Sequence, residues 1–255
     1  VQAESILSVE DLDVHYGGSR ILRDVSLGIP NGSIAAIMGR NGVGKTTLLK
    51  AIMGLLEPSK GRVLFDGADI TALGADRRAR RGLGYVPQGR EIFPRLTVRE
   101  NLQIGLQARE GGGEVSAEVF EPFPVLADMQ ERMAGNLSGG QQQQLAIARA
   151  LVGDPRVLIL DEATSALDTV SEAKVQEALQ YLIQARTTFV IPHRLSTIKS
   201  AHKIVVLNEG RVEQIGSHDE LFAKDGLYRE LYDPEWAEKR SKLRDERIKR
   251  LVNVA

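Results

Sequence analysis

The chain has 255 residues, of which 42% are hydrophobic, so it can bury a core as one large domain or two small ones. Its 33 Lys and Arg residues nearly balance 34 Asp and Glu residues, which argues against a nucleic-acid partner, and the absence of cysteine excludes disulfides and thiolate metal sites. No apolar run approaches the roughly 18 residues that span a bilayer, and no secretory signal is evident, so we expect a soluble chain.

The predicted elements begin with an alternating apolar and polar segment over residues 7–16, which indicates an antiparallel strand. Apolar strands are expected over 33–38, 156–160 and 187–191, and they alternate with helices over 46–53 and 171–184. A hairpin is expected over 204–215, turning at 208–210. This alternation predicts an α/β fold with a largely parallel sheet.

The middle and the end of the chain differ from this pattern. Residues 89–153 contain helical segments broken by glycine and proline, which favours a helical subdomain inserted into the α/β core. A basic cluster at 77–81 is interpreted as a solvated face rather than a lipid or partner contact. Residues 235–255 are expected to form an appended helical tail, either solvated or docked on a membrane or partner.

Residues 39–46, GRNGVGKT, match the phosphate-loop pattern between a predicted strand and a predicted helix. Backbone N–H groups of such a loop surround a β-phosphate, Lys45 adds a cation, and the Thr46 hydroxyl is placed to ligate Mg²⁺. The alternative is a glycine-rich turn with an incidental lysine. The residues predicted to bind ATP or GTP here are Gly39, Asn41, Gly42, Gly44, Lys45, Thr46 and Thr47.

An apolar strand ends in Asp161 and Glu162, where a parallel sheet meets its ligand crevice. Asp161 is predicted to hold Mg²⁺, and Glu162 is predicted to act as general base on a water in line with the γ-phosphate. Taken alone, an apolar strand followed by two acids is more often a strand that runs into a solvated turn. The phosphate loop on the same chain favours the catalytic interpretation.

A third motif, LSGGQ at 137–141, precedes a predicted helix. A Ser-Gly-Gly turn is also a plain helix cap. In combination with the other two motifs it resembles the signature of ATP-binding cassette (ABC) proteins, and the resemblance extends over residues 6–232. It implies a P-loop NTPase core of ABC type, with an antiparallel β subdomain and the inserted helical subdomain, within residues 1–234. It also implies that Ser138, Gly139, Gly140 and Gln141 bind nucleotide.

The resemblance extends to further positions. It implies that Tyr16 stacks on adenine, that Gln88 acts in catalysis and in holding Mg²⁺, that Asp168 of the D-loop contacts nucleotide, and that His193 is the catalytic switch histidine. It further implies a sandwich dimer in which the signature of one copy covers the γ-phosphate of the other, as a homodimer or a heterodimer. ATP and Mg²⁺ are the implied cofactors.

The two parts of the chain resemble different branches of the family. Up to about residue 160 the chain resembles importer ATPases of the branched-chain amino acid and urea type, whereas the remainder resembles exporter nucleotide-binding domains, so a hybrid is considered. Ala163 replaces the proline usual in such importers, and Pro192 precedes the switch histidine where exporters have a small residue. The surface around Gln88 is importer-like.

From this surface we expect a transport ATPase working with a separate importer-type permease, held through it at the cytoplasmic face of a membrane. The alternatives are an excised exporter domain, and a soluble cassette ATPase of DNA repair, iron–sulfur assembly or translation. A catalytically silent binding module is a further alternative, which the retained Lys45, Asp161, Glu162 and His193 disfavour.

Overall fold

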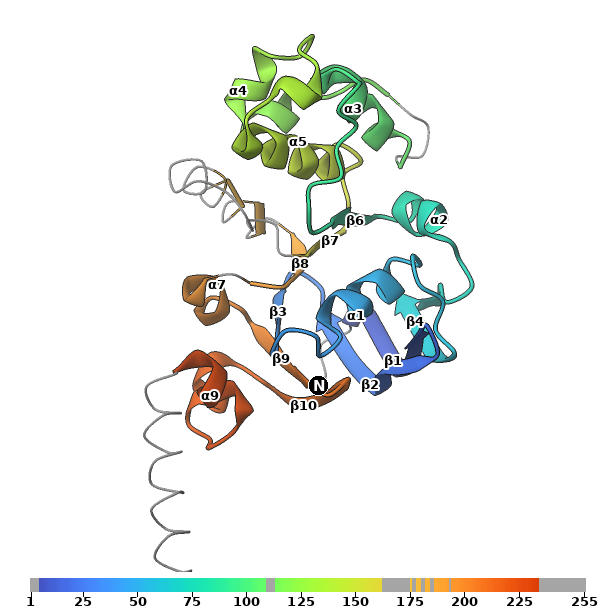
Figure 1. Ribbon diagram of the computed structural model, residues 1–255, viewed down its shortest axis with the longest axis vertical. Helices are drawn as coiled ribbons and strands as arrows, with labels where there is room; N and C mark the ends of the chain where they lie inside the picture. The colour runs from blue at the N-terminus through green and yellow to red at the C-terminus, as the bar shows by residue number, and fades with distance from the viewer. Residues whose placement is uncertain are drawn as a thin grey trace, which may run out of the picture.

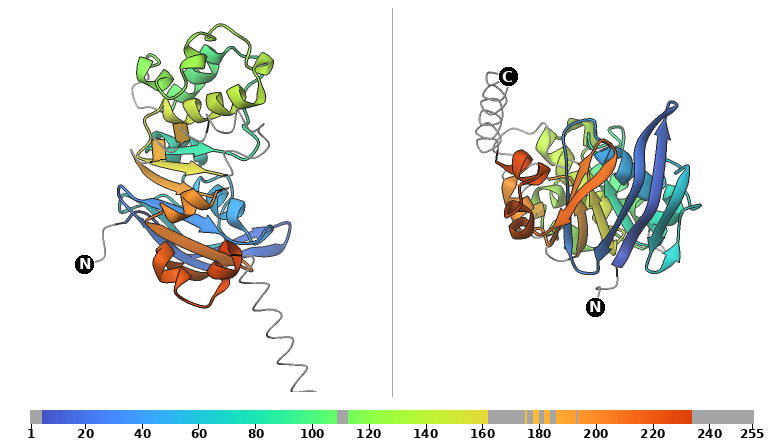
Figure 2. Two further views of the ribbon diagram at one scale, coloured as in Figure 1. Left: turned by 90° about the vertical axis from the view of Figure 1, so that its left-hand side faces the viewer. Right: turned by 90° about the horizontal axis from the view of Figure 1, so that it is seen from below.

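Two β-sheets and a group of helices make up the described part of the chain in a computed structural model (Figure 1). The structure describes residues 5–108, 113–161, 175, 178–179, 182–183, 186–192 and 194–233. The helices between β6 and β7 lie at one end of the molecule, and the sheets lie at the other (Figure 1). The left view of Figure 2 shows the same elongated arrangement from another side, and the right view looks at the molecule from below.

The smaller sheet is antiparallel and confirms the strand predicted at 7–16. It has the order β2-β1-β4-β5, and β1 pairs antiparallel with both β2 and β4. Its strands are β1 (Ser5–Tyr16), β2 (Ser19–Pro30), β4 (Lys60–Phe65) and β5 (Ala68–Asp69).

The larger sheet has the order β10-β9-β3-β8-β7-β6. Its pairs are parallel from β9 to β6, and only β10 is antiparallel, in the hairpin predicted at 204–215. Its strands are β3 (Ile34–Met38), β6 (Leu83–Val86), β7 (Val157–Leu160), β8 (Thr187–Val190), β9 (Lys203–Asn208) and β10 (Arg211–Gly216). The three strands expected to be parallel are confirmed to within one residue.

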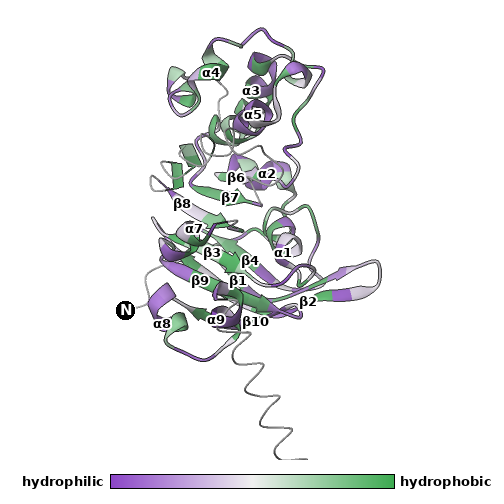
Figure 3. Ribbon diagram, turned by 60° about the vertical axis from the view of Figure 1, so that its left-hand side comes forward, coloured by the Kyte–Doolittle hydropathy of each residue, from purple (hydrophilic) through white to green (hydrophobic). Residues whose placement is uncertain are grey.

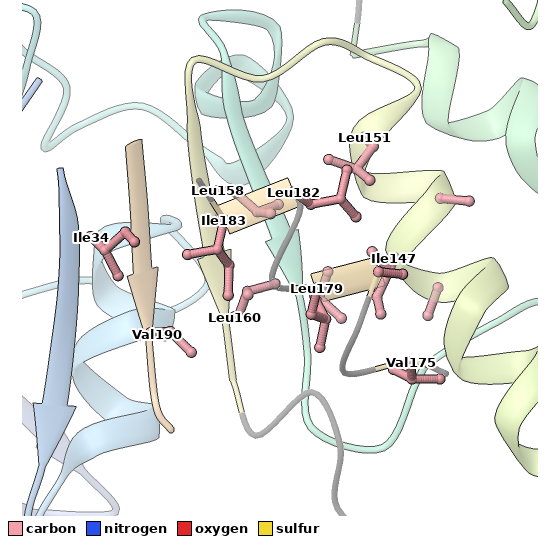
Figure 4. Close-up of a cluster of buried hydrophobic side chains, with 14 of the residues drawn as sticks. Ile34, Ile147, Leu151, Leu158, Leu160, Val175, Leu179, Leu182, Ile183 and Val190 are labelled. Atoms are coloured by element: carbon pink, nitrogen blue, oxygen red, sulfur yellow. The ribbon is translucent and has the colours of Figure 1, made fainter. Parts of the chain in front are cut away.

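Both faces of β3, β7 and β9 are buried along most of their length, which explains their apolar runs, and Figure 3 shows β3 and β7 as mostly hydrophobic. The edge strand β10 instead alternates exposed and half-buried residues. In β7, Leu158 and Leu160 belong to one core cluster, whereas Val157 and Ile159 belong to the other. Figure 4 shows Leu158 and Leu160 facing Ile147 of helix α5 (Gly139–Leu151) and a row of apolar side chains, each of which is buried in the described structure. That row consists of Val175, Leu179, Leu182 and Ile183. Each such side chain stabilises the fold by roughly 1.5–3 kcal/mol.

The second core cluster joins the opposite face of this sheet to the smaller sheet and to α1 (Lys45–Ile52). Leu48, Leu49 and Ile52 of α1 are fully buried there, beside Ala35 and Ile37 of β3. The helix that follows the phosphate loop is therefore fixed on two sides, which confirms the helix predicted at 46–53 to within one residue.

Helices and 3₁₀ turns occupy the described residues between β6 and β7. Thr97 caps the first of them through a reciprocal pair of hydrogen bonds with Glu100. Besides α5, these elements are α3 (Val98–Leu106), η1 (Ala117–Phe120), α4 (Pro124–Ala127) and η2 (Ala134–Asn136). This agrees with the helical character expected from the sequence, while the subdomain boundary at 89–153 stays a prediction.

In the part of the chain that the structure describes, three short helices follow β8: α7 (Leu195–Lys199), α8 (His218–Phe222) and α9 (Leu227–Tyr232). The buried Tyr228 of α9 hydrogen-bonds His218 of α8, with 2.6 Å between Oη and Nδ1. Within the described ranges, no helix combines the length and the apolar character needed to traverse a bilayer. The tail predicted at 235–255, and all but five residues of the helix predicted at 171–184, lie outside the described residues.

The basic cluster at 77–81 is not uniformly solvated, so that prediction was wrong for Arg78 on α2 (Ala75–Arg80). Its side chain is 1% exposed and donates to four backbone carbonyls. Nη1 lies 2.8 and 2.7 Å from the carbonyls of Ala51 and Ile52, and Nε and Nη2 reach those of Leu73 and Thr71. Arg78 thus adds donors to the carbonyls of the last turn of α1, of which that of Ala51 also accepts from the Gly54 N–H at 3.1 Å.

Candidate functional site

The phosphate loop runs from the end of β3 to the start of α1, as its sequence predicts. Gly44 adopts a φ of 107° at the helix N-cap, and Gly39 adopts a φ of 153° with its Cα against the carbonyl of Leu207. A Cβ at Gly39 would collide with that carbonyl, so glycine is required there. The loop therefore exposes backbone N–H groups at the start of a helix, which favours an anion.

The Lys45 side chain bridges the loop. Its Nζ lies 2.8 Å from the carbonyl of Gly39 and 2.9 Å from that of Arg40. The ammonium is therefore held over the same concave backbone that exposes the N–H groups. A cation in this place suits a polyphosphate whose negative charge enters the loop.

Asp161 is brought to the same place by the sheet. It follows β7, is fully buried, and its Oδ1 accepts a hydrogen bond of 3.0 Å from the Thr46 hydroxyl. Its Oδ2 accepts a 3.2 Å bond from the Tyr85 hydroxyl. Burial and the neighbouring Asp161 carboxylate raise the pKa of Tyr85 well above its usual range, which keeps that hydroxyl protonated as a donor. A carboxylate and a hydroxyl oxygen are ligands that Mg²⁺ prefers.

A cavity of about 490 Å³ opens beside the loop, a size that suits a nucleotide. Tyr16 stands at it with an exposed ring, and Gln88 reaches it from the segment after β6. The cavity is lined by Tyr16, Ile21, Asn41, Gly42, Gly44, Lys45, Thr46, Thr47, Lys50, Leu56 and Gln88. The structure thus brings together the residues that the sequence assigned to the phosphate loop, to adenine stacking and to the glutamine loop.

The LSGGQ turn lies elsewhere. Ser138 is the N-cap of α5: its hydroxyl accepts from the Gln141 N–H at 3.3 Å, and its own N–H donates to Gln141 Oε1 at 2.9 Å. The helix cap that the Ser-Gly-Gly sequence also predicts is thus present. Among the described residues lining the cavity, none comes from Ser138, Gly139, Gly140 or Gln141. Within one chain, the signature turn and the phosphate loop form separate surfaces.

Three of the predicted site residues, Glu162, Asp168 and His193, lie outside the described residues. Their roles stay predictions.

Sequence reasoning missed several residues that the fold places at the site. Tyr85 orients Asp161, while Ile21, Lys50 and Leu56 complete the cavity wall. Lys50 was detectable, because it lies three and four residues after Thr47 and Thr46 and therefore on the same helix face. Tyr85 was not, because its contact depends on the pairing of β6 with β7.

Comparison with known proteins supports this site. The family described as "ABC transporter" matches residues 22–165. The ATP-dependent lipid A-core flippase of Desulfotalea psychrophila is 41% identical over 235 residues, or 89% of this chain and 41% of that protein. The human mitochondrial potassium channel ATP-binding subunit is 41% identical over 222 residues, or 84% of this chain and 30% of that protein.

A solved structure, that of a bacterial Atm1-family ABC exporter with ATP bound, has a TM-score of 0.76 and 32% identity to this chain. The match covers 94% of this chain and 42% of that one. The chain thus spans less than half the length of these three proteins. The structural match is to an exporter, so the comparisons do not support the separate importer-type permease expected from the sequence.

The family match includes the phosphate loop, the signature turn and Asp161, and the structural match extends over nearly the whole chain with the same P-loop core. Relatives that match most of its length include a Bacillus subtilis protein named as an ABC transporter ATP-binding protein and the lipid A-core flippase. The chain belongs to the ABC transporter family and is an ATP-binding domain of its ATPases.

Proposed function

We propose that this domain hydrolyses Mg-ATP between two cassettes and thereby drives an exporter-type transporter. The observation that carries the proposal is that Lys45 and Thr46 line one cavity beside an uncapped helix N-terminus, where the Thr46 hydroxyl also hydrogen-bonds Asp161. These residues suit a nucleotide triphosphate with its magnesium ion, since they supply a cation, oxygen ligands and backbone donors.

In this proposal Thr46 and Asp161 would hold the magnesium ion, with Gln88 at the edge of the same cavity. The ion, when bound, neutralises charge on the β- and γ-phosphates. Lys45 moves from the carbonyls of Gly39 and Arg40 to the phosphates. Glu162 accepts the proton of the attacking water, and His193 contacts the γ-phosphate. Tyr85 keeps the Asp161 carboxylate in its orientation.

A second cassette completes the site. Ser138 lies at the exposed N-terminus of the 13-residue helix α5, away from the cavity of its own chain. The helix N-terminus and the Ser138 and Gly140 groups suit the γ-phosphate held by another copy. We therefore propose a head-to-tail dimer in which each chain contributes its phosphate loop to one site and its signature turn to the other.

The membrane-spanning partner is proposed to dock in a groove of about 430 Å³ beside α2, α3 and α5. Three large apolar side chains line it while remaining exposed: Leu55 at 50%, Phe93 at 43% and Ile104 at 40%. Arg149 of α5 lies with its Cζ 5.1 Å from the centre of the Phe93 ring. The three apolar side chains favour an apolar segment of the partner, and the Arg149 guanidinium favours a hydrogen-bond acceptor on that segment. A bound partner would hold the domain at the cytoplasmic face of a membrane.

The catalytic part is tested with Glu162→Gln. The variant should bind ATP with unchanged affinity, lose turnover by about tenfold or more, and accumulate as an ATP-dependent dimer. Fluorescent-nucleotide titration, phosphate release and sedimentation measure these three properties. Unchanged hydrolysis would remove Glu162 from the mechanism, and absence of any ATP-dependent dimer at high protein concentration would overturn the sandwich arrangement.

The docking part is tested by affinity purification from membranes in mild detergent. An Ile104→Glu chain should lose a membrane-spanning partner that the unmodified chain retains, whereas Ile215→Glu, at a similarly exposed isoleucine of β10, should keep it. Equal retention by both variants contradicts the groove. Recovery of a separate permease of importer type would contradict the exporter assignment.

A further inference from the structure

The segment that follows Gln88 reaches from the nucleotide cavity to the signature helix. Gln88 lines the cavity, and two residues later Arg90 donates from Nη1 to the Gln142 side-chain carbonyl at 3.1 Å. Gln142 in turn donates from Nε2 to the Leu137 carbonyl at 3.2 Å. Leu137 immediately precedes Ser138, so two hydrogen bonds connect the loop after Gln88 to the start of the signature turn.

The backbone at Arg90 is held in an uncommon form. Gly89, Arg90 and Glu91 have φ values of 91°, 72° and 49°, and the Glu91 N–H donates to the Gly89 carbonyl at 2.8 Å, which closes a three-residue γ-turn. A positive φ is unfavourable for residues with a Cβ, and this kind of γ-turn is rare. A strained conformation at two successive side-chain-bearing residues persists only where the surroundings fix it.

The far end of the segment is anchored independently. Buried Asn101 of α3 accepts from the Phe93 N–H at 2.9 Å and donates to the Phe93 carbonyl at 3.0 Å. The loop therefore runs between two fixed points, β6 on one side and α3 on the other. A displacement of Gln88 has to be taken up within residues 89–92, where Arg90 makes its contact with α5.

The guanidinium also packs against the signature turn itself. A Cβ placed on Gly139 would lie 3.2 Å from Arg90 Nη2 and 3.3 Å from Nη1, so the group rests on the bare backbone of the first residue of α5. A cation gains nothing from the dipole at the N-terminal end of a helix. Direct contacts, rather than the dipole, therefore account for this placement.

We propose that Arg90 is a positioning residue that couples the Gln88 loop to the signature turn. Nucleotide in one cavity, sensed at Gln88, sets the orientation of residues 138–141, which the proposed dimer presents to the cavity of the partner. The inference rests on the proposed function, because it needs a signature turn that acts on a second copy. Arg90 itself touches no reacting group in this scheme.

The test compares Arg90→Ala with Arg95→Ala, an exposed arginine in the same segment. Nucleotide affinity of the monomer should be unchanged in both. In Arg90→Ala the ATP concentration that half-saturates dimer formation should rise about tenfold, within the range common for coupling between sites. KM for ATP should rise with it while kcat at saturating ATP changes little, a split that mere loss of stability would not produce.

Gln142→Glu is the second variant, and it decides the matter if Arg90→Ala does not fold. It keeps an acceptor for Arg90 but cannot donate to the Leu137 carbonyl, so the link breaks at its second bond. The ATP concentration that half-saturates dimer formation should rise as it does in Arg90→Ala, and the double variant should show no further rise. An unchanged dimer titration in Gln142→Glu, or additive effects in the double variant, would overturn the inference. Absence of ATP-dependent dimers in the unmodified chain would instead contradict the proposed function.

Discussion

The phosphate loop and the signature turn are both glycine-rich turns that open a helix, yet their N–H groups are used in opposite ways. At the start of α1 the N-cap is Gly44, which has no side chain to accept a hydrogen bond. At the start of α5 the N-cap is Ser138, which exchanges hydrogen bonds with Gln141 in a capping box. The first turn leaves its donors for a ligand, whereas the second satisfies two of them internally.

This difference separates two tasks. An open helix N-terminus with a lysine beside it can surround a polyphosphate, but it depends on the ligand to satisfy its donors. A capped N-terminus keeps its shape without a ligand and can be presented as a preformed surface to another molecule. Each helix is also contacted by an arginine from outside. Arg78, at the far end of α1, is buried, whereas Arg90, beside the start of α5, is half-buried.

The largest expected effect concerns the open turn. Lys45→Ala removes the cation over the loop and should lower kcat/KM for ATP by about 1,000-fold, with little change in thermal stability. Steady-state phosphate release measures it. Lys224→Ala, at an exposed lysine after α8, is the control and should behave as the unmodified chain. Retained activity in Lys45→Ala would mean that the open turn does not hold the phosphates.

The next effect concerns the far end of the same helix. Arg78→Met leaves the carbonyls of Ala51, Ile52, Thr71 and Leu73 without their buried donor and should lower the free energy of unfolding by about 3 kcal/mol. Denaturant titration of this variant is compared with Arg77→Met, a neighbour on the exposed side of α2. Equal stability of the two variants would show that Arg78 is not needed to hold α1.

A smaller effect is expected at the capped turn. Gln141→Ala removes one half of the capping box and should destabilise α5 by about 1 kcal/mol, while nucleotide binding by the monomer stays unchanged. Hydrogen exchange at the amides of α5, set beside a nucleotide titration, separates the two properties. A loss of monomer binding would contradict the separation of the two turns.

The smallest effect is expected at the hydrogen bond between Tyr85 of β6 and Asp161 after β7, beside the open turn. Tyr85→Phe removes one hydrogen bond to Asp161, so about two- to threefold more Mg²⁺ should be needed for half-maximal hydrolysis. A Mg²⁺ titration at saturating ATP measures this, with Tyr228→Phe, far from the site, as a matched control. An unchanged Mg²⁺ requirement would mean that Asp161 is oriented without the Tyr85 hydroxyl.

Much of this protein follows from its sequence alone. The strand over 34–38, the loop from Gly39 to Gly44 and the helix after it were predicted to within one residue, and the antiparallel strand ending at Tyr16 to within two. These features depend on patterns within about ten consecutive residues: apolar runs, glycines where φ is positive, and a lysine at the start of a helix. Local patterns of that kind are present in the sequence itself.

Other features were decided only by the tertiary structure. Arg78 is buried and Arg77 is exposed, although both belong to the same basic run. Tyr85 meets Asp161 because β6 pairs with β7, and Arg90 meets Gln142 because α5 packs beside the loop after Gln88. These contacts join residues 50 or more positions apart. No local pattern specifies them, because they depend on which buried faces come together when the strands and helices pack.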